Sequence, residues 1–540
     1  HTDFTGGKVK FIVEDDNVVF VEFEETRSLA HGLAAVVHEG LRFNDQHLVP
    51  HAARFDEPLA GEGLKARALR AKPEALRNGI NRHKAYIVPL ASVFLARISK
   101  PCKDKHGACP SKVAHRGVRQ GGWARGLVLA LVVLTAFFGV MAVVVSWREI
   151  DERVGIYFAC LLWVLGGITG VFMAVDLFFF YFFWEVMLIP MYFLIGVWGH
   201  SNRVYAAIKF FIFTLVGGLL MLVSILALVL DHATQTGVTT FDYTELLGTP
   251  VTGPAAFWIM LGFFVAFAVK LPAVPIHNWL PDAHTEAPTA GSLVLAALLL
   301  KTGAYGLIRF VVPLFPEQSE ALAPWALWLG VFGIIYGAIL AFAQTDLKRL
   351  VAYTSVSHMG FVLLGVYSWN ALALQGTVMQ MICHGISTGA LFMVVGMLYE
   401  RIHTRDVTKM GGLWSTVPRL AGVAMVFAMA SLGLPGTGNF VGEFLIIFGV
   451  FPIDVVVTVV ALIGIVAATV YSLRIIQTTF HGPAETVWTI DDMSTRETLM
   501  MAPMVVAIVW LGLWPQTVIA TFEPALESLL HLVPAMVGGG

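Results

Sequence analysis

Charged residues are scarce in this sequence. Asp, Glu, Lys and Arg make up only 13% of its 540 residues, whereas 57% are hydrophobic. A soluble globular domain usually needs about 25% charged residues to cover its surface. This deficit excludes an ordinary soluble protein and predicts a polytopic membrane protein.

The sequence also lacks the common cofactor motifs. It has four cysteines, no CxxC pair, no P-loop and no GxGxxG between a strand and a helix. The nearest approach to a metal motif is Cys102-x6-Cys109 with His106 between them, which is a weak signal. We therefore expect no nucleotide, flavin, iron–sulfur or metal site in this chain.

Long apolar runs occupy the chain from about residue 126 onward. Each is close to the ~20 residues that a helix needs to cross about 30 Å of hydrocarbon, and helices satisfy their own backbone there. Twelve spans are predicted, at residues 126–146, 155–175, 177–199, 205–230, 255–276, 286–311, 324–343, 350–368, 372–399, 418–451, 456–480 and 499–518. The predicted fold class is an all-α polytopic membrane protein.

Basic residues alternate between the loops that join these spans. Every second loop carries Lys or Arg, and the intervening loops 231–255, 312–323, 369–374 and 452–456 carry neither. The positive-inside rule therefore places the basic loops in the cytoplasm and the other four outside.

Residues 1–126 do not follow this pattern. They hold 20 of the 35 Lys and Arg residues and contain no apolar run of membrane length. The topology above would place this basic segment outside, although long domains can cross regardless of charge. Two interpretations stay open: a soluble periplasmic domain, or a segment that comes from a frameshift or a wrong join in the gene.

Four charged residues lie inside predicted spans or beside their interruptions: Glu185, Lys270, Lys301 and Glu443. Lys301 is about 13 Å of helix from either end of its span, too far to reach water easily. A central charge costs ~2.5–3.5 kcal/mol, so these groups must face one another, other polar groups or water. They are the candidates for proton transport, and a structural role as buried ion pairs is the alternative for each.

Five further residues are weaker candidates. Lys209 is near the cytoplasmic end of its span, where reaching water and pairing with an acid are both open. Arg309 is expected at a helix end. His277, His358 and His384 can be ordinary core residues, but three together favour a proton relay because histidine titrates nearest neutrality.

Prolines and glycines interrupt two predicted spans next to these charges. LPAVPIHNWLP follows Lys270, and SLGLPGTG precedes Glu443 about 165 residues later. Broken backbone is tolerated at membrane depth only where it is buried in protein or lines a polar cavity. Residues 155–311 and 324–480 are thus predicted as two five-span units. Because each unit has an odd number of spans, the two units enter the membrane from opposite sides and are inverted relative to each other, as in secondary transporters.

Several long motifs resemble the antiporter-like subunits of respiratory complex I (NADH-quinone oxidoreductase), which are related to Mrp-type cation/proton antiporter subunits. The matching motifs are WEVMLIPMYFLIGVWG, FAVKLPAVPIHNWLPDAHTEAPTAGS, LLLKTGAYGLIRF, AFAQTDLKRLVAYTSVSHMGFVLLG and GLPGTGNFVGEF. The resemblance covers about residues 126–520, and Glu443 in NFVGEF is typical of the M-type chains.

The resemblance assigns a place to each candidate. Glu185 would be the glutamate of the fifth span, and Lys270 its lysine partner on the broken seventh. Lys301 would be the connecting lysine of the eighth span, and Glu443 the acid of the broken twelfth. The three histidines match polar positions of a central hydrated axis. The implied activity is proton translocation driven by quinone reduction elsewhere in the complex, with a Mrp-type sodium/proton antiporter subunit as the alternative.

The resemblance also implies the setting of the chain. It implies fourteen spans, ten of which form two inverted five-helix repeats, and twelve of the fourteen are visible in this sequence. Residues 127–154 come before the repeats, and residues 481–540 form the last span and a short tail. NADH, FMN, iron–sulfur clusters and quinone would belong to partner subunits, so this chain would hold no cofactor. The expected partners are the other membrane subunits, above all the neighbouring antiporter-like ones, and the lipid bilayer of the bacterial inner membrane, with no nucleic acid.

Overall fold

The computed structural model describes the secondary structure of residues 8–14 and 17–24, and it describes residues 124–247, 249, 251, 253–483 and 488–531. The Cys102, His106 and Cys109 cluster lies outside the described residues, as does most of the segment 1–126. The chain divides into two compact units, His1–Asn78 and Gly79–Gly540.

The first unit contains a β-hairpin. Strands β1 (Lys8–Glu14) and β2 (Asn17–Glu24) pair antiparallel, with an irregularity in register between Ile12 and Val13. Their sequences, KVKFIVE and NVVFVEFE, are rich in the β-branched and aromatic residues that favour strands.

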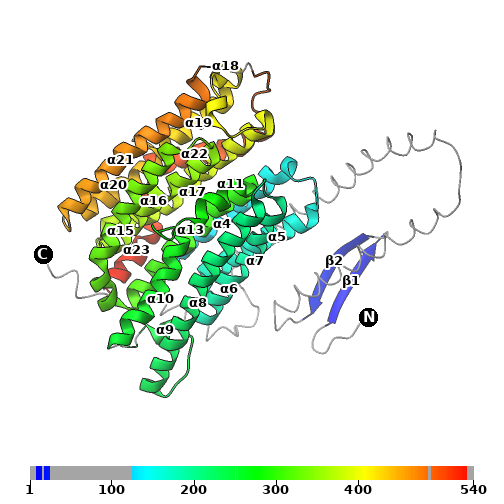
Figure 1. Ribbon diagram of the computed structural model, residues 1–540. Coiled ribbons are helices and arrows are strands. Elements are labelled where there is room, and N and C mark those ends of the chain that lie inside the picture. The colour runs from blue at the N-terminus through cyan, green and yellow to red at the C-terminus, as the bar shows by residue number, and fades with distance from the viewer. Residues whose placement is uncertain are drawn as a thin grey trace. The chain divides into compact units, whose positions relative to one another are not determined.

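The described residues of the second unit, from Ala124 onward, form helices wherever they have regular secondary structure (Figure 1). Its first half comprises α4 (Arg125–Glu149), α5 (Val154–Met173), α6 (Leu177–Val186), α7 (Leu188–Trp198), α8 (Arg203–Thr236), α9 (Tyr243–Leu246), α10 (Pro254–Lys270), α11 (Trp279–Glu286), α12 (Thr289–Val294), the π-helical turn η3 (Leu295–Leu299), α13 (Leu300–Gly306), the π-helical turn η4 (Leu307–Val311) and α14 (Val312–Leu314).

The second half continues without strands among the described residues. It comprises α15 (Pro316–Ala343), α16 (Leu347–Tyr367), α17 (Ala371–Ile402), the 3-10 turn η5 (Val407–Lys409), α18 (Leu413–Thr416), α19 (Pro418–Ser431), α20 (Gly438–Val450), α21 (Val455–Ile476), the π-helical turn η6 (Gln477–His481), α22 (Thr495–Leu513) and α23 (Gln516–His531). The predicted all-α membrane fold is confirmed for this unit.

Ten helices of the described chain are long and apolar enough to cross a membrane. They are Arg125–Glu149, Val154–Met173, Leu177–Trp198, Arg203–Thr236, Thr289–Leu314, Pro316–Ala343, Leu347–Tyr367, Ala371–Ile402, Val455–His481 and Thr495–Leu513. The other two predicted spans, 255–276 and 418–451, fall on the shorter apolar helices α10, α19 and α20. A total of twelve therefore stays a prediction that counts these interrupted helices as crossings.

Both predicted interruptions are present. Helix α10 ends at Lys270, and α11 begins only at Trp279, after the prolines of LPAVP. Helix α19 ends at Ser431, and α20 begins at Gly438 after LGLPGT. Proline supplies no backbone donor and its ring clashes with the preceding turn, so each helix stops where the sequence predicts.

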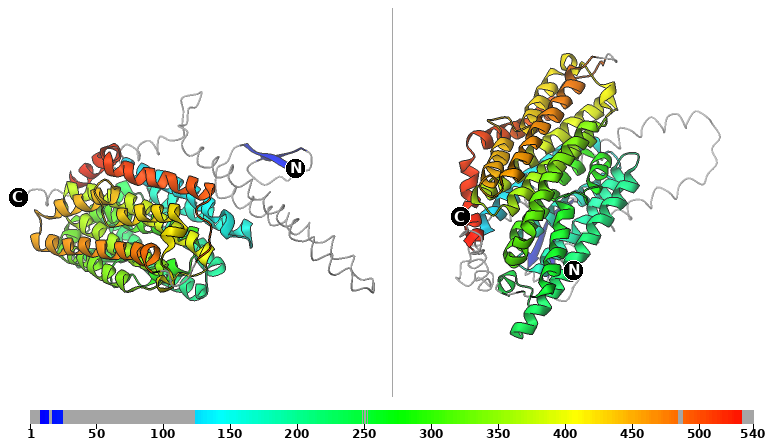
Figure 2. Two further views of the ribbon diagram at one scale, coloured as in Figure 1. Left: turned by 90° about the horizontal axis from the view of Figure 1, so that it is seen from above. Right: turned by 60° about the vertical axis from the view of Figure 1, so that its left-hand side comes forward.

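The centre of the bundle lies around three helices. The segment Thr289–Leu314 and helix α16 are fully buried within the bundle over their apolar windows, and α17 is almost so. In Figures 1 and 2 these helices run between α20 and α21 on one side and α7 and α8 on the other. The outer helices expose apolar side chains such as Val223, Leu230 and Val466, as expected of surfaces that face lipid.

One local structure occurs twice. Asp176 caps α6 by accepting hydrogen bonds from two backbone N–H groups, and it forms an isolated antiparallel bridge with Asp242, the cap of α9. Asp346 caps α16 in the same way and bridges Asp406, the cap of η5. In both places the backbone at the start of one long helical segment pairs with the loop that follows the next long helix, α8 in the first case and α17 in the second.

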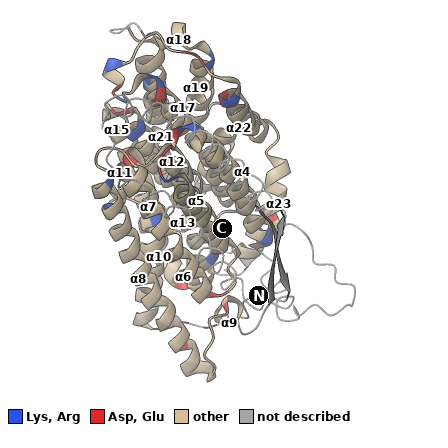
Figure 3. Ribbon diagram, turned by 90° about the vertical axis from the view of Figure 1, so that its right-hand side faces the viewer, with Lys and Arg blue, Asp and Glu red and all other residues tan. Residues whose placement is uncertain are grey.

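Charges concentrate at one end of the bundle. In Figure 3 most coloured segments lie around α11, α12, α18, α19 and α22, whereas α8 and α10 are uncharged over most of their length. This end holds the loops that the basic residues predict to be cytoplasmic.

Candidate functional site

Glu185 and Lys270 form the first part of the site. Lys270 is the fully buried last residue of α10, and its Nζ lies 4.8 Å from the centre of the Trp184 ring on α6. Glu185 is the next residue of α6, and its charge interacts electrostatically with Lys270. Within the described chain, neither Lys270 Nζ nor the buried Glu185 Oε1 has a hydrogen-bond partner. The pair is close enough to interact but is not locked together.

Two glycines allow this close packing. A Cβ at Gly218 on α8 would collide with Glu185 Oε1, so the carboxylate occupies the space that a side chain would fill. A Cβ at Gly303 on α13 would lie 2.7 Å from the Phe267 carbonyl oxygen and 3.1 Å from the Lys270 Cβ. The helix that carries Lys301 is therefore packed directly against the end of α10.

His277 lies in the interruption after α10. Its buried ring packs edge-on against Tyr336 of α15, with ring centroids 5.4 Å apart, and 6.5 Å from the ring of Tyr353 on α16. The loop is held to α10 by Trp279, whose Nε1 donates to the Val269 carbonyl at 2.9 Å. His277 is thus placed near Lys270 in sequence, but no described hydrogen bond joins it to Lys301.

Lys301 is bound in the centre of the bundle. It is fully buried, and its Nζ lies 2.6 Å from both the Ala296 carbonyl oxygen and His384 Nδ1. Ala296 belongs to the π-helical turn η3, an interruption of the regular α-helical pattern of a type that recurs at functional sites. A protonated lysine has only donors, so His384 Nδ1 accepts this bond when Lys301 is charged.

Glu443 lies in a hydrogen-bonded network on the other side of His384. His358 Nδ1 is 2.8 Å from Glu443 Oε1, and Gln380 Nε2 donates to the same oxygen at 2.8 Å. His358 Nε2 is 3.1 Å from Ser431 Oγ and 3.3 Å from the Tyr471 hydroxyl. An ionised carboxylate is only an acceptor, so His358 Nδ1 is the donor to it.

Two histidines join these groups into one row. The rings of His384 and His358 meet edge to face, with centroids 5.5 Å apart. Lys301 on α13, His384 on α17, His358 on α16 and Glu443 on α20 thus form a continuous buried series, with every step at hydrogen-bond or ring-contact distance. The structure brings together four of the predicted residues.

Lys209 is separate from this row. Its Nζ lies 2.6 Å from Asp282 Oδ2, and Arg349 Nη1 lies 3.5 Å from the other oxygen of Asp282. Of the two roles left open by the sequence, the structure places Lys209 in an ion pair. Its partner Asp282 was not singled out, although it lies within the quoted motif PDAHTEAPTAGS.

A set of polar contacts anchors the junction between α11 and α12. Buried Lys348 donates to the Ala287 carbonyl oxygen at 2.5 Å, and Arg405 donates to the Thr285 carbonyl oxygen. Glu149 Oε1 accepts from the backbone N–H and the hydroxyl of Thr289. Helices α4, α16 and the loop after α17 thus hold the segment that follows the first interruption.

The loops at this end contain two perturbed groups. Burial, with the nearby positive charges of Lys348 and Arg405, lowers the pKa of His200 to about 3. Hydrogen bonding to the Thr408 side chain lowers the pKa of Asp406. Both groups thus keep one charge state at neutral pH, His200 neutral and Asp406 ionised.

Several polar partners were missed by sequence reasoning. Gln380, Ser431 and Tyr471 carry no charge, so nothing in the sequence separates them from other polar residues in spans. Arg309 was expected at a helix end but is buried in η4, where its guanidinium lies 4.5 Å from the centre of the Tyr243 ring. A cation–π contact needs only a neighbouring aromatic ring, which an arginine in an aromatic-rich membrane protein readily finds.

Across the part of the chain that the structure describes, no group of three or more His, Cys, Asp or Glu side chains is arranged to hold a metal ion.

Comparisons with known proteins identify the family. Residues 174–469 match the family model described as NADH:quinone oxidoreductase/Mrp antiporter, TM. The chain is 58% identical over 400 residues to NADH-quinone oxidoreductase subunit M of Pseudomonas aeruginosa, covering 73% of this chain and 79% of that protein. It is 54% identical over 412 residues to subunit M of Escherichia coli strain K12, covering 75% and 81%.

Solved structures agree with these relatives. A chain of respiratory complex I from Thermus thermophilus with bound NADH superposes with a TM-score of 0.71 at 33% identity, covering 76% of this chain and 85% of that one. A chain of the Mrp complex from Dietzia shares the fold, with a TM-score of 0.65 at 24% identity over 74% and 44%. The chain therefore belongs to the NADH:quinone oxidoreductase/Mrp antiporter family, among the subunit M chains of NADH-quinone oxidoreductase.

Proposed function

We propose that this membrane subunit of NADH:quinone oxidoreductase translocates protons across the bacterial inner membrane, driven by quinone reduction in partner subunits. The observation that carries the proposal is the buried row from Lys301 through His384 and His358 to Glu443. Ionisable residues inside a membrane are costly, so a continuous series of them indicates an ion path.

The first half supplies the group that responds to the rest of the complex. Glu185 and Lys270 attract each other but are not hydrogen-bonded to each other or to other described groups. A small movement of Glu185 away from Lys270 therefore removes much of the interaction that favours the charged lysine. Lys270 then releases its proton, which moves through His277 and water towards Lys301.

The buried row that starts at Lys301 carries the proton onward. Lys301 passes it to His384, His384 to His358, and His358 to Glu443, from which it leaves towards the external face. Lys301 and His384, and His358 and Glu443, are at hydrogen-bond distance, and the rings of His384 and His358 are in contact. Gln380, Ser431 and Tyr471 orient the last two groups by direct hydrogen bonds.

The proposal includes two inverted five-helix units, residues 155–311 and 324–480. The repeated aspartate bridge supports it, because Asp176 and Asp346 each cap the second long helical segment of their unit. The interruptions after Lys270 and before Glu443 fall in the fourth segment of each unit.

The proposal assigns the redox chemistry to other chains. NADH, FMN, the iron–sulfur clusters and quinone would be bound by partner subunits, and neighbouring antiporter-like subunits would contact this chain in the membrane. The subunit M names of its relatives and the likeness to a chain of complex I support this assignment.

The test is NADH-driven acidification of inverted membrane vesicles that carry Glu185→Gln. The exposed Glu317→Gln on α15 is the matched control, since it removes an equivalent charge at a surface position. We expect Glu185→Gln to abolish both proton uptake and NADH oxidation in a fully assembled complex, with the control unchanged. Assembly is checked by native electrophoresis.

Two outcomes would redirect the proposal. Unchanged pumping with Glu185→Gln would assign the glutamate a structural role only. Sodium-dependent proton movement that persists without NADH would favour the Mrp-type sodium/proton antiporter, whose relatives share the fold.

A further inference from the structure

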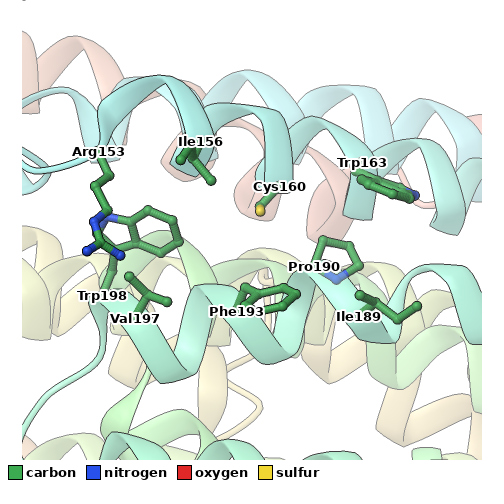
Figure 4. Close-up of a pocket in the computed structure, with 9 residues that line it drawn as sticks. All are labelled: Arg153, Ile156, Cys160, Trp163, Ile189, Pro190, Phe193, Val197 and Trp198. Carbon is green, nitrogen blue, oxygen red and sulfur yellow. The ribbon is translucent and has the colours of Figure 1, made fainter. Parts of the chain in front are cut away.

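A narrow groove runs along the outer surface between α5 and α7. It has a volume of about 350 Å³ and is lined by Arg153, Ile156, Cys160, Trp163, Ile189, Pro190, Phe193, Val197 and Trp198. Figure 4 shows Arg153 and Trp198 at one end, Cys160 in the middle, and Trp163 and Ile189 at the other end. The groove is independent of the buried row that carries the proposed function.

The dimensions of the groove indicate what fits it. Arg153 and Trp163 are ten residues apart on α5, which is about 15 Å at 1.5 Å per residue. An α-helix with its side chains is about 10–12 Å across, so 15 Å of helix would occupy on the order of 1,200–1,700 Å³, several times the volume of the groove. A helix of another subunit therefore does not fit inside the groove. One extended hydrocarbon chain does.

The lining has the polarity of a lipid site. Ile156, Trp163 and Phe193 are exposed and apolar, on helices that are long enough to span the membrane. Trp198 lies at the end of its helix, and its Nε1 donates to the Glu152 carbonyl at 2.8 Å. A tryptophan whose ring contacts apolar groups and whose N–H is hydrogen-bonded is typical of the membrane interface, at the depth of the lipid headgroups.

Positive charge is available at this end of the groove. Arg153 is exposed, and no ion pair joins it to the adjacent exposed acids Asp151 and Glu152 in the described chain. Arg203 lies nearby, and its guanidinium donates hydrogen bonds to the carbonyl oxygens of Val197 and Gly199. The guanidinium of arginine binds phosphate oxygens in a two-pronged geometry. The loop is on the predicted cytoplasmic side, the leaflet surface that anionic lipids make negative.

We propose that the groove between α5 and α7 is a specific site for one anionic phospholipid of the cytoplasmic leaflet. One acyl chain lies along Ile156, Cys160 and Phe193, and the phosphate binds Arg153. The site ties the lipid to α5 and α7, on the surface of the half that contains Glu185.

The experiment uses the whole complex, reconstituted in vesicles of phosphatidylcholine with one-tenth phosphatidylglycerol. The phosphatidylglycerol carries a photoactivatable group in its acyl chain, and labelled peptides are identified by mass spectrometry. We expect labelling of residues on α5 and α7, reduced about five-fold by Arg153→Gln, the factor of one basic residue at an anionic surface. Arg419→Gln, which removes an exposed arginine in the first turn of α19, is expected to leave the labelling unchanged.

A second pair of variants tests the acyl chain separately from the phosphate. Cys160→Phe fills the middle of the groove and should remove the label while Arg153 is intact; Cys160→Ser preserves the volume and should retain it. Equal labelling by photoactivatable phosphatidylcholine, independent of Arg153, would overturn the proposal in favour of ordinary surrounding lipid. Absence of label with crosslinks to a neighbouring subunit would overturn it in favour of a protein contact.

Discussion

The two halves of the bundle share a scaffold but treat buried charge differently. Each contains an aspartate bridge, at Asp176 or Asp346, and each contains an interrupted helix beside a charged residue. In the first half, Lys270 Nζ has no hydrogen-bond partner in the described chain and lies over an indole ring. In the second, Glu443 Oε1 receives hydrogen bonds from both His358 and Gln380.

This difference separates two physical roles. A buried charge without hydrogen bonds is costly, so small changes nearby alter its protonation easily. A buried charge with several hydrogen bonds is stabilised in one geometry, and removing any member leaves its partners unsatisfied. The first half is thus suited to respond to a signal, and the second to conduct protons through fixed contacts.

Removing the acid of the second half should have the largest effect on stability. Glu443→Ala leaves His358 and Gln380 buried without their common acceptor, and breaking a buried pair costs about 3–5 kcal/mol. We expect a clear fall in the thermal unfolding midpoint of the purified complex, which scanning fluorimetry measures. Glu443→Gln retains an acceptor and should be markedly more stable; equal loss in both would show that the network adds little.

Neutralising the charged pair of the first half should affect transport and not stability. Glu185→Gln combined with Lys270→Met removes two charges that have no hydrogen bonds to lose, so the change in stability should stay within about 1 kcal/mol. NADH-driven proton pumping should be lost. A fall in thermal midpoint as large as that of Glu443→Ala would erase the contrast between the halves.

Interrupting the row between the halves should give an intermediate effect. His384→Phe keeps an aromatic ring beside His358 but takes away the acceptor of Lys301. We expect pumping to fall about 100-fold or more, since one member of a proton relay contributes roughly 10²–10⁴ in rate. The variant is compared with His232→Phe, which removes a buried histidine far along α8 that bonds Thr249. Equal pumping in the two variants would exclude His384 from the path.

The smallest effects are expected at the repeated caps. Asp176→Ala removes a helix cap worth about 1 kcal/mol. Asp346→Ala removes an equivalent cap and also the contact with Arg405 at 3.1 Å, so it should cost slightly more. Amide hydrogen exchange in the first turns of α6 and α16 measures the stability lost in each variant. Protection lost to the same extent in both helices would mean that the Arg405 contact contributes nothing.

The sequence predicted the features that follow from local rules. Proline and glycine predicted both helix interruptions, and the distance of Lys301 from the ends of its span predicted its burial. Both features depend only on residues close together in the chain. The partners of the buried groups were not predictable in this way. Glu443 bonds His358, 85 positions away, and Lys209 pairs with Asp282, 73 positions away, contacts that only the packing of helices decides.

Two helix ends also hold contacts that local rules do not predict. Glu149 and Lys348, each at a helix end, were not singled out from the sequence, and both are bonded to the segment after α11. An isolated helix end predicts exposure, whereas a neighbouring broken helix presents free carbonyl and N–H groups that such side chains bind. The neighbour is not visible in the sequence of the helix itself.

Gly218 shows that the location of a charge can be set by a residue that carries none. The carboxylate of Glu185 lies where a methyl group at 218 would be. A single added carbon would therefore displace the acid without altering its chemistry. This position offers a purely mechanical way to ask how far the glutamate can move before the lysine no longer senses it.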